Sequence, residues 1–269
     1  MLTKALLLLF CSSPLIAFSQ PITWIHGART AALANSGTAL EGPWATSGNP
    51  AGMARSSSLA LAFALERRFL LEELDVRAAT ALFPLRKQVL GLNISSFGGE
   101  LYHRSRISLS SARAFSSSFR MGLAVNHHRM KISGYPGQKA WSITVGMQYA
   151  VFSNITAGIF VTNPNKASFV EEIKEALPVT AAMGIAWAFS QKVLGVAGLK
   201  RVSGIPLSVH CGLEYLPHPS LAVRVGASSA PFRHYGGLGL MWGHFRLDMA
   251  ISSHLQLGLT PQISMGYGH

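Results

Sequence analysis

Residues 179–199 read VTAAMGIAWAFSQKVLGVAGL, and their pattern distinguishes a helical from a β-stranded membrane protein. It is long and apolar enough to be considered as a membrane-spanning helix, interrupted only by Gln191 and Lys192. Its large side chains, however, alternate with small ones: Val179, Ala181, Met183, Ile185, Trp187 and Phe189 against Thr180, Ala182, Gly184, Ala186, Ala188 and Ser190. A period of two is typical of a β-strand with two different faces, whereas a helix would mix the two sets around its circumference. We therefore predict a strand here.

The same alternation recurs along the chain, at 59–66, 142–149, 207–215, 221–226 and 245–252. In each stretch, every second residue is strongly apolar, and the residues between are mostly Gly, Ala and Ser with scattered charges. We call these two alternating sets the two parities of a strand. The water-facing side of a soluble sheet is usually rich in Lys, Glu and Thr. The small face found here suits the inside of a narrow, occupied barrel, with the apolar face turned to lipid.

Alternation and turn signals predict about fourteen strands. Tilted strands of roughly 9–11 residues span a membrane, and single-chain bacterial barrels have an even strand count. Lipid also requires closure, because an open sheet edge leaves backbone groups unpaired. The predicted class is an all-β, antiparallel transmembrane barrel with strands near 57–66, 74–84, 87–97, 101–113, 117–132, 139–152, 154–163, 179–190, 192–201, 206–217, 219–228, 235–244, 245–254 and 260–268.

Composition agrees with a protein that is partly covered by lipid. Charged residues make up 13% of the chain, about half the usual share, and hydrophobic residues 49%. The net charge of +12 comes from scattered basic residues, which we interpret as contacts to outer-membrane lipid, lipopolysaccharide or a partner, not nucleic acid. Aromatic residues near strand ends could form interfacial girdles: Trp141, Tyr149, Trp187, Phe189, Tyr215, Trp242 and Tyr267.

The start of the chain is typical of a secretory signal. Lys4 precedes an apolar run from Ala5 to Phe10, and Ala17-Phe18-Ser19 offers small residues for cleavage before Gln20. We therefore expect a signal peptide at 1–19, an N-terminal lumenal segment at 20–56 and a barrel at 57–269, located in the outer membrane of a Gram-negative bacterium. Cys211 would be the only cysteine of the mature chain, so no intramolecular disulfide is expected.

One stretch interrupts the alternation. In residues 164–178 the apolar positions Phe169, Ile173, Ala176 and Leu177 have helical spacing, and Glu171, Glu172, Lys174 and Glu175 supply charge. This pattern predicts a short amphipathic helix in a loop, either solvated or serving as a docking site.

Residues 20–56 are rich in glycine and alanine, and they lack the alternation of a strand. Such a chain can approach the small residues of an inner barrel wall closely. The segment resembles the N-terminal signature of the PorV/PorQ family, which is itself similar to FadL-type proteins. The matching positions are Gly27, Ala28, Arg29, Ala31, Leu33, Trp44, Ala45, Asn49, Pro50, Ala51, Gly52 and Met53.

The C-terminal stretch 237–269 also looks like this family. The resemblance implies a fourteen-stranded barrel with an N-terminal hatch in its lumen. It further implies an accessory role in type IX protein secretion of Bacteroidetes, with a large secretion-system barrel or other type IX components as partners. The alternative is a FadL-like channel for small hydrophobic compounds. Gly42-Pro43 stands where the family often has an acidic residue, and the short chain leaves little room for long loops.

The inward parity also carries charge, at Glu214, Arg224, Arg246 and Asp248. Buried charges must pair, so we expect these residues and Arg29 to fix the hatch to the wall. A polar path for solute is the alternative interpretation.

Catalytic and metal sites are not predicted. His127 and His128 are neighbours on a strand and point to opposite faces, so they cannot easily share an ion. No carboxylate or cysteine has ligand spacing, and there is no G-x-S-x-G motif. We expect no cofactor and no enzyme, although a barrel hydrolase assembled from distant strands stays an alternative.

Overall fold

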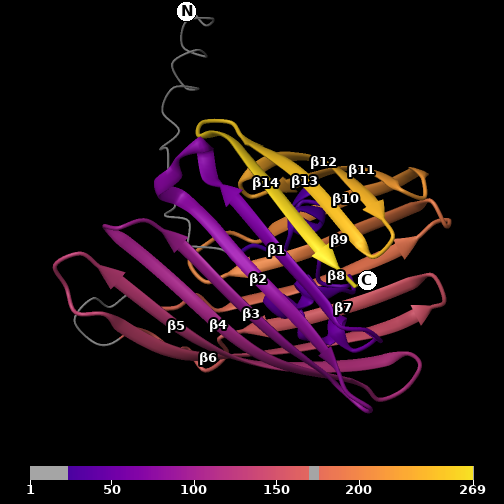
Figure 1. Ribbon diagram of the computed structural model, residues 1–269, viewed down its shortest axis with the longest axis horizontal. Helices are drawn as coiled ribbons and strands as arrows, with labels where there is room; N and C mark the ends of the chain where they lie inside the picture. The colour runs from indigo at the N-terminus through magenta and orange to yellow at the C-terminus, as the bar shows by residue number, and fades with distance from the viewer. Residues whose placement is uncertain (1–23, 170–175, 269) are drawn as a thin grey trace, which may run out of the picture.

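The structure is a computed structural model that describes residues 24–169 and 176–268. These residues form a closed barrel of fourteen antiparallel strands (Figure 1), in which neighbours along the chain pair with each other and β1 closes against β14. The strands are β1 Ala60–Arg67, β2 Asp75–Pro84, β3 Val89–Gly98, β4 Tyr102–Ala114, β5 Phe119–Ile132, β6 Gln138–Phe152, β7 Ile155–Thr162, β8 Thr180–Ala188, β9 Val193–Val202, β10 Ser208–His218, β11 Leu221–Ser229, β12 Phe232–Trp242, β13 Phe245–His254 and β14 Gly258–Tyr267.

The predicted fold class is confirmed, and the predicted strands all form. Their ends shift where cross-strand pairing, not side-chain alternation, sets the boundary. Strand β12 begins at Phe232 instead of residue 235, because Phe232 pairs with Ser229 across a tight turn. Strand β1 begins at Ala60 instead of residue 57. No helix in the described part of the chain is long and apolar enough to cross a membrane.

The two faces of the wall are the predicted ones. On β1, Phe63 is 58% exposed on the outside while Ala62, one residue away, is 1% exposed. On β8, Met183, Ile185 and Trp187 are exposed, and Ala182 and Ala186 are buried. Large apolar side chains therefore cover the outer surface, and small ones line the lumen.

The two ends of the barrel differ in their connections. One end carries the longer ones, with residues 163–179 and the short 3-10 turns η3 (Arg68–Leu70) and η4 (Glu72–Leu74). The other end has only short turns, such as residues 153–154 and 243–244. We call these the loop end and the turn end.

The predicted girdle residues are all exposed; Trp141 lies toward the loop end, and the others lie at the turn end: Tyr149, Trp187, Phe189, Tyr215, Trp242 and Tyr267.

The prediction of a helix over residues 164–178 is wrong for the part that the structure describes. Ser168 and Ala176 form an isolated antiparallel bridge. This bridge lets both Phe169 and Leu177 pack against Met130 and Ala140 of the wall. Residues 170–175 lie outside the described residues, as does the predicted signal peptide at 1–19.

Candidate functional site

The segment from residue 24 to residue 56, which we call the lumenal segment, lies inside the barrel (Figure 1). It contains the short helix α2 (Ala28–Ala32) and the 3-10 turns η1 (Pro43–Ser47) and η2 (Pro50–Met53). Helix α2 contacts β12, β13 and β14, and η2 contacts β4, β5 and β6. The lumenal segment runs from the loop end, where Trp24 packs against a cluster that contains Val76 and Phe97, to the turn end, where Arg55 donates a hydrogen bond to the carbonyl of Ser117.

Wall glycines allow this close approach. A Cβ on Gly122 of β5 would lie 2.5 Å from the carbonyl carbon of Pro50, and a Cβ on Gly237 of β12 would lie 2.5 Å from the Cβ of Ala32. Both distances are far shorter than van der Waals contact, so any larger residue at either position would displace the lumenal segment.

The residues that carry the family resemblance have structural roles within the segment. Gly27 has φ +78° and its missing side chain leaves room for the Trp44 indole. The Asn49 side chain caps η2 by accepting a hydrogen bond from the Ala51 amide at 3.2 Å. Pro50 follows at the first position of the turn, and Ala51 and Gly52 are fully packed inside the barrel.

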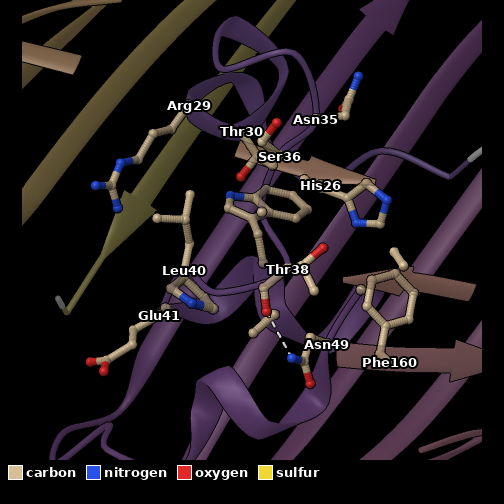
Figure 2. Close-up of a pocket in the computed structure, with 18 of the residues that line it drawn as sticks. His26, Arg29, Thr30, Asn35, Ser36, Thr38, Leu40, Glu41, Asn49 and Phe160 are labelled. Carbon is tan, nitrogen blue, oxygen red and sulfur yellow. Dashed lines mark hydrogen bonds between the residues drawn. The ribbon is translucent and has the colours of Figure 1, made fainter. Parts of the chain in front are cut away.

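Asn49 also joins the segment to itself and to the wall. Its Nδ2 donates to the carbonyl of Thr38 at 2.7 Å (Figure 2) and to the carbonyl of Met147 on β6 at 3.0 Å. Gln148, the next residue of β6, donates to the carbonyls of Thr38 and Leu40 at 3.1 Å each. Gln148 was not among the predicted site residues, because a single inward amide carries no distinctive sequence signal.

The predicted lumen charges come together in one cluster. Glu214 of β10 pairs directly across the sheet with Arg224 of β11, with Arg224 Nε 2.5 Å from a Glu214 carboxylate oxygen. Arg29 of the lumenal segment reaches the other oxygen of Glu214 at 2.6 Å and makes a second bond through its Nε at 2.9 Å. Arg224 and Arg246 lie 2.8 Å and 2.9 Å from the two oxygens of Asp248.

A further ion pair was not predicted. Glu41 of the lumenal segment pairs with Arg120 of β5, a side chain with no exposed surface, and lies 3.9 Å from Arg55. Ala28 adds a neutral contact, since its amide donates to the Ser264 hydroxyl of β14 at 3.0 Å. The lumenal segment is therefore bound to opposite sides of the wall.

Cavities remain between the segment and the wall. One of about 160 Å³ lies between the segment and strands that include β7, β9 and β13 (Figure 2). A second, of about 300 Å³, lies toward the loop end, and its lining combines polar and charged side chains with aromatic and aliphatic ones that include Trp24, Phe69, Phe97, Ile205 and Tyr235. A third, of about 80 Å³, lies against β4, β5 and β6. His26 and Lys200 line all three cavities.

The wall around these cavities is continuous. Strand β3 pairs with β2 from Val89 to Phe97 and with β4 over its whole length. The register shifts that occur in the described strands lie near Ala150 of β6 and Tyr215 of β10, both at the turn end. Neighbouring strands are therefore hydrogen-bonded to each other all round the described part of the wall.

Histidine–serine pairs occur in the lumen. Ser208 Oγ lies 2.7 Å from His210 Nε2, Ser142 Oγ lies 2.9 Å from His128 Nε2, and Ser47 Oγ lies 2.9 Å from His26 Nδ1. The other ring nitrogen of His210 contacts the Ala34 carbonyl, and that of His128 has no partner among the described residues. No hydrogen bond from a carboxylate of the described residues orients any of these histidines as in a catalytic triad. The described residues contain no group of three or more potential metal ligands.

No family model matches this chain, and no curated protein matches it. Solved structures do. The toluene transporter TodX of Pseudomonas putida superposes with a TM-score of 0.72 at 11% identity, covering 92% of this chain and 99% of that one. The monoaromatic hydrocarbon channel CymD gives 0.69 at 12% identity, covering 93% and 99%. A FadL homologue of Pseudomonas aeruginosa gives 0.65 at 11% identity, covering 93% and 99%. The chain therefore has the fold of FadL-type channels.

Proposed function

We propose that this barrel is an outer-membrane channel for small hydrophobic compounds. The observation that carries the proposal is a lumen that is filled, though incompletely, by a segment bound through a few polar contacts. The resemblance to structures described as toluene and monoaromatic hydrocarbon channels supports it. This is the alternative interpretation of the sequence, and it fits the lumen better than the accessory role does.

The cavities have the size that such solutes need. An apolar cavity of about 150 Å³ binds benzene in a well-studied case. The loop-end cavity, of about 300 Å³, is larger than that, and Trp24, Phe97 and Tyr235 give it aromatic surfaces. A small aromatic compound entering from the loop end would meet this cavity first.

Passage beyond it requires the lumenal segment to shift. The Arg29–Glu214 and Arg120–Glu41 contacts hold the segment at β10 and β5, and small wall residues hold it by packing. We infer that the segment is the gate of the channel and that its displacement opens a path.

The test is a reversible crosslink. Ala28 and Ser264 are in direct contact, so A28C/S264C in a Cys211→Ser background would join the segment to β14. Uptake of labelled toluene into cells that express this variant should fall to the level of cells without the barrel, and it should recover after reduction. The single variant A28C in the same background is the matched control.

Two results would separate the parts of this proposal. Equal uptake with and without the barrel contradicts the channel function. Barrel-dependent uptake that the crosslink leaves unchanged contradicts the gate and retains the channel.

The continuous wall favours a second candidate function. A plugged barrel whose strand β3 is paired along its length on both sides suits an accessory protein of the PorV/PorQ type that binds a large secretion-system barrel. A pull-down of the tagged protein from detergent-solubilised outer membranes tests this candidate. Recovery of a very large barrel, together with loss of surface-displayed cargo on deletion, would support it, and absence of both would contradict it.

We further propose lipopolysaccharide as a partner of the outer surface. Longer loops are typical of the extracellular side of bacterial barrels, so the loop end faces outward from the cell. At that end, His103, Arg129, Lys131 and Lys139 are adjacent in the register of β4, β5 and β6 and point away from the lumen. This group, which we call the basic rim, lies just beyond Trp141, where lipid phosphates would lie.

A further inference from the structure

A group of basic side chains lies in the lumen, away from the balanced cluster around Glu214. The cavity of about 80 Å³ is lined by Arg106 of β4, His128 of β5, Lys200 of β9 and His26 of the lumenal segment. Arg104 and Trp24 line it as well. No aspartate or glutamate in the described part of the chain lines this cavity.

The strand register brings the first two side chains together. Arg106 and His128 are direct cross-strand partners on the inner face of the barrel. They are 4% and 5% exposed, so both are shielded from bulk solvent. The guanidinium of Arg106 lies 5.1 Å from the centre of the Trp24 ring, which holds it beside the cavity.

Both side chains keep unused hydrogen-bonding capacity. Arg106 Nε and His128 Nδ1 have no partner among the described residues. Arg106 makes one long bond, from Nη2 to the side-chain oxygen of Asn93 at 3.4 Å. A buried guanidinium without a compensating carboxylate is costly, and folded proteins rarely leave one so.

The contrast with the cluster at β10–β13 is informative. There, Arg224 is equally buried but contacts both Glu214 and Asp248 within 3 Å. The barrel wall therefore supplies two carboxylates to the buried Arg224. Its described residues supply none to the buried Arg106.

The local electrostatics point the same way. Burial, together with the positive charges of Lys200 and Arg106, lowers the pKa of His26 to about 3. His26 is thus neutral at physiological pH, mainly because it is buried and also because cationic side chains lie near it. Among the described residues, an anion entering this cavity would meet the cationic side chains of Arg106 and Lys200.

We propose that this cavity is a binding site for a compact oxyanion, a carboxylate or a phosphate, held by Arg106 and Lys200 with His128 and His26 as hydrogen-bonding neighbours. The cavity volume suits a group of that size. His26 and Lys200 also line the two larger cavities, so the anion is either a free ion or the acidic group of a solute whose remainder occupies those cavities. The site does not depend on the channel function, because binding is measured on the purified protein.

The experiment is calorimetric titration of the refolded full barrel in a neutral detergent at low chloride. One arm uses inorganic phosphate and the other uses benzoate, with toluene as the neutral control. Saturable binding of phosphate alone identifies a site for the free ion. Saturable binding of benzoate alone identifies a site for an acidic solute, and binding of both identifies a general oxyanion site. Absence of saturable binding in both arms overturns the proposal.

Variants connect the binding to these residues. Arg106→Gln and, separately, Lys200→Met should each raise the Kd for the bound anion about tenfold, the usual effect of losing a charge-assisted hydrogen bond. Arg106→Lys, which keeps the charge, should lose less. Arg201→Gln changes an exposed, outward side chain of β9, next to Lys200, and is the matched control. Two variants are used because Arg106 is deeply buried, and heat-dependent gel migration verifies that each barrel folds. Unchanged affinity in folded forms of both Arg106→Gln and Lys200→Met would also overturn the proposal.

Discussion

At the scale of single residues, Glu214 is the point on which the lumen charges depend. Its two oxygens receive Arg29 and Arg224, and its side chain is 5% exposed. Glu214→Gln would leave two arginines partly uncompensated, which costs about 3–5 kcal/mol for a buried pair. Urea unfolding in detergent should show a loss of stability in this range. Glu72→Gln, in an exposed turn, is the matched control and should be neutral. Equal stability of the two variants would contradict the role of Glu214.

His26 gives a residue-scale prediction about pH. Its pKa in the folded protein is about 3, below the ordinary value of about 6.5, so between these values the unfolded chain binds a proton that the folded chain does not. Its contribution to stability is therefore full above pH 6.5 and is lost as the pH falls toward 3. The melting temperature of wild type should fall more than that of His26→Gln between pH 7.5 and 4.5. Parallel pH profiles would contradict this assignment.

Single residues also show how far the sequence predicts the site. Inward parity identified Glu214, Arg224, Arg246 and Asp248, since a charge on the small face of a strand is conspicuous. Arg120 and Arg106 have the same parity, on β5 and β4. Parity alone does not distinguish them, because their significance comes from surroundings outside the strand: Glu41 for Arg120, and for Arg106 a cavity with no carboxylate among its described lining.

At the scale of elements, strands β4, β5 and β6 are the long ones, and their loop ends carry the basic rim. Replacing Arg129, Lys131 and Lys139 with Gln should weaken binding of lipopolysaccharide, at roughly 1 kcal/mol for each charge near an anionic lipid surface. Native mass spectrometry of the purified barrel with lipid A measures this effect. The control replaces Lys87 and Lys192, exposed lysines at the turn end. Similar losses in both proteins would indicate nonspecific charge attraction and contradict a defined rim.

Elements differ in how well alternation predicts them. Spanning strands were predictable because lipid outside and a packed lumen inside impose two distinct faces on every strand. The segment at 164–178 was not, because helical spacing of Phe169 and Leu177 also arises when two extended pieces pack on one wall. Periodicity over so short a stretch does not distinguish the two arrangements.

At the scale of the whole molecule, closure and an even strand count follow from the membrane, whereas the path through the lumen does not. The lumenal segment has no periodicity, and its course is set by the positions of wall glycines and by partners on β5, β10 and β14. Those partners are far apart in the sequence, as Arg29 and Glu214 are. Alternation within strands carries no information about such pairs, so the function has to be argued from the folded lumen.

The filled lumen leads to a prediction for the molecule as a barrier. The inner wall carries polar side chains such as Asn93, Ser108, Asn126 and Gln148, which the lumenal segment and the barrel now shield. Deleting residues 24–55 would expose this wall to water and turn the barrel into an aqueous pore. In planar bilayers, the single-channel conductance of the deletion variant should exceed that of wild type several-fold. Arg29→Ala with Glu41→Ala should give brief openings of the same size, because the segment is then loosened but present. A folded deletion variant that stays as closed as wild type would mean that the wall itself collapses inward, and the segment would then not be the barrier.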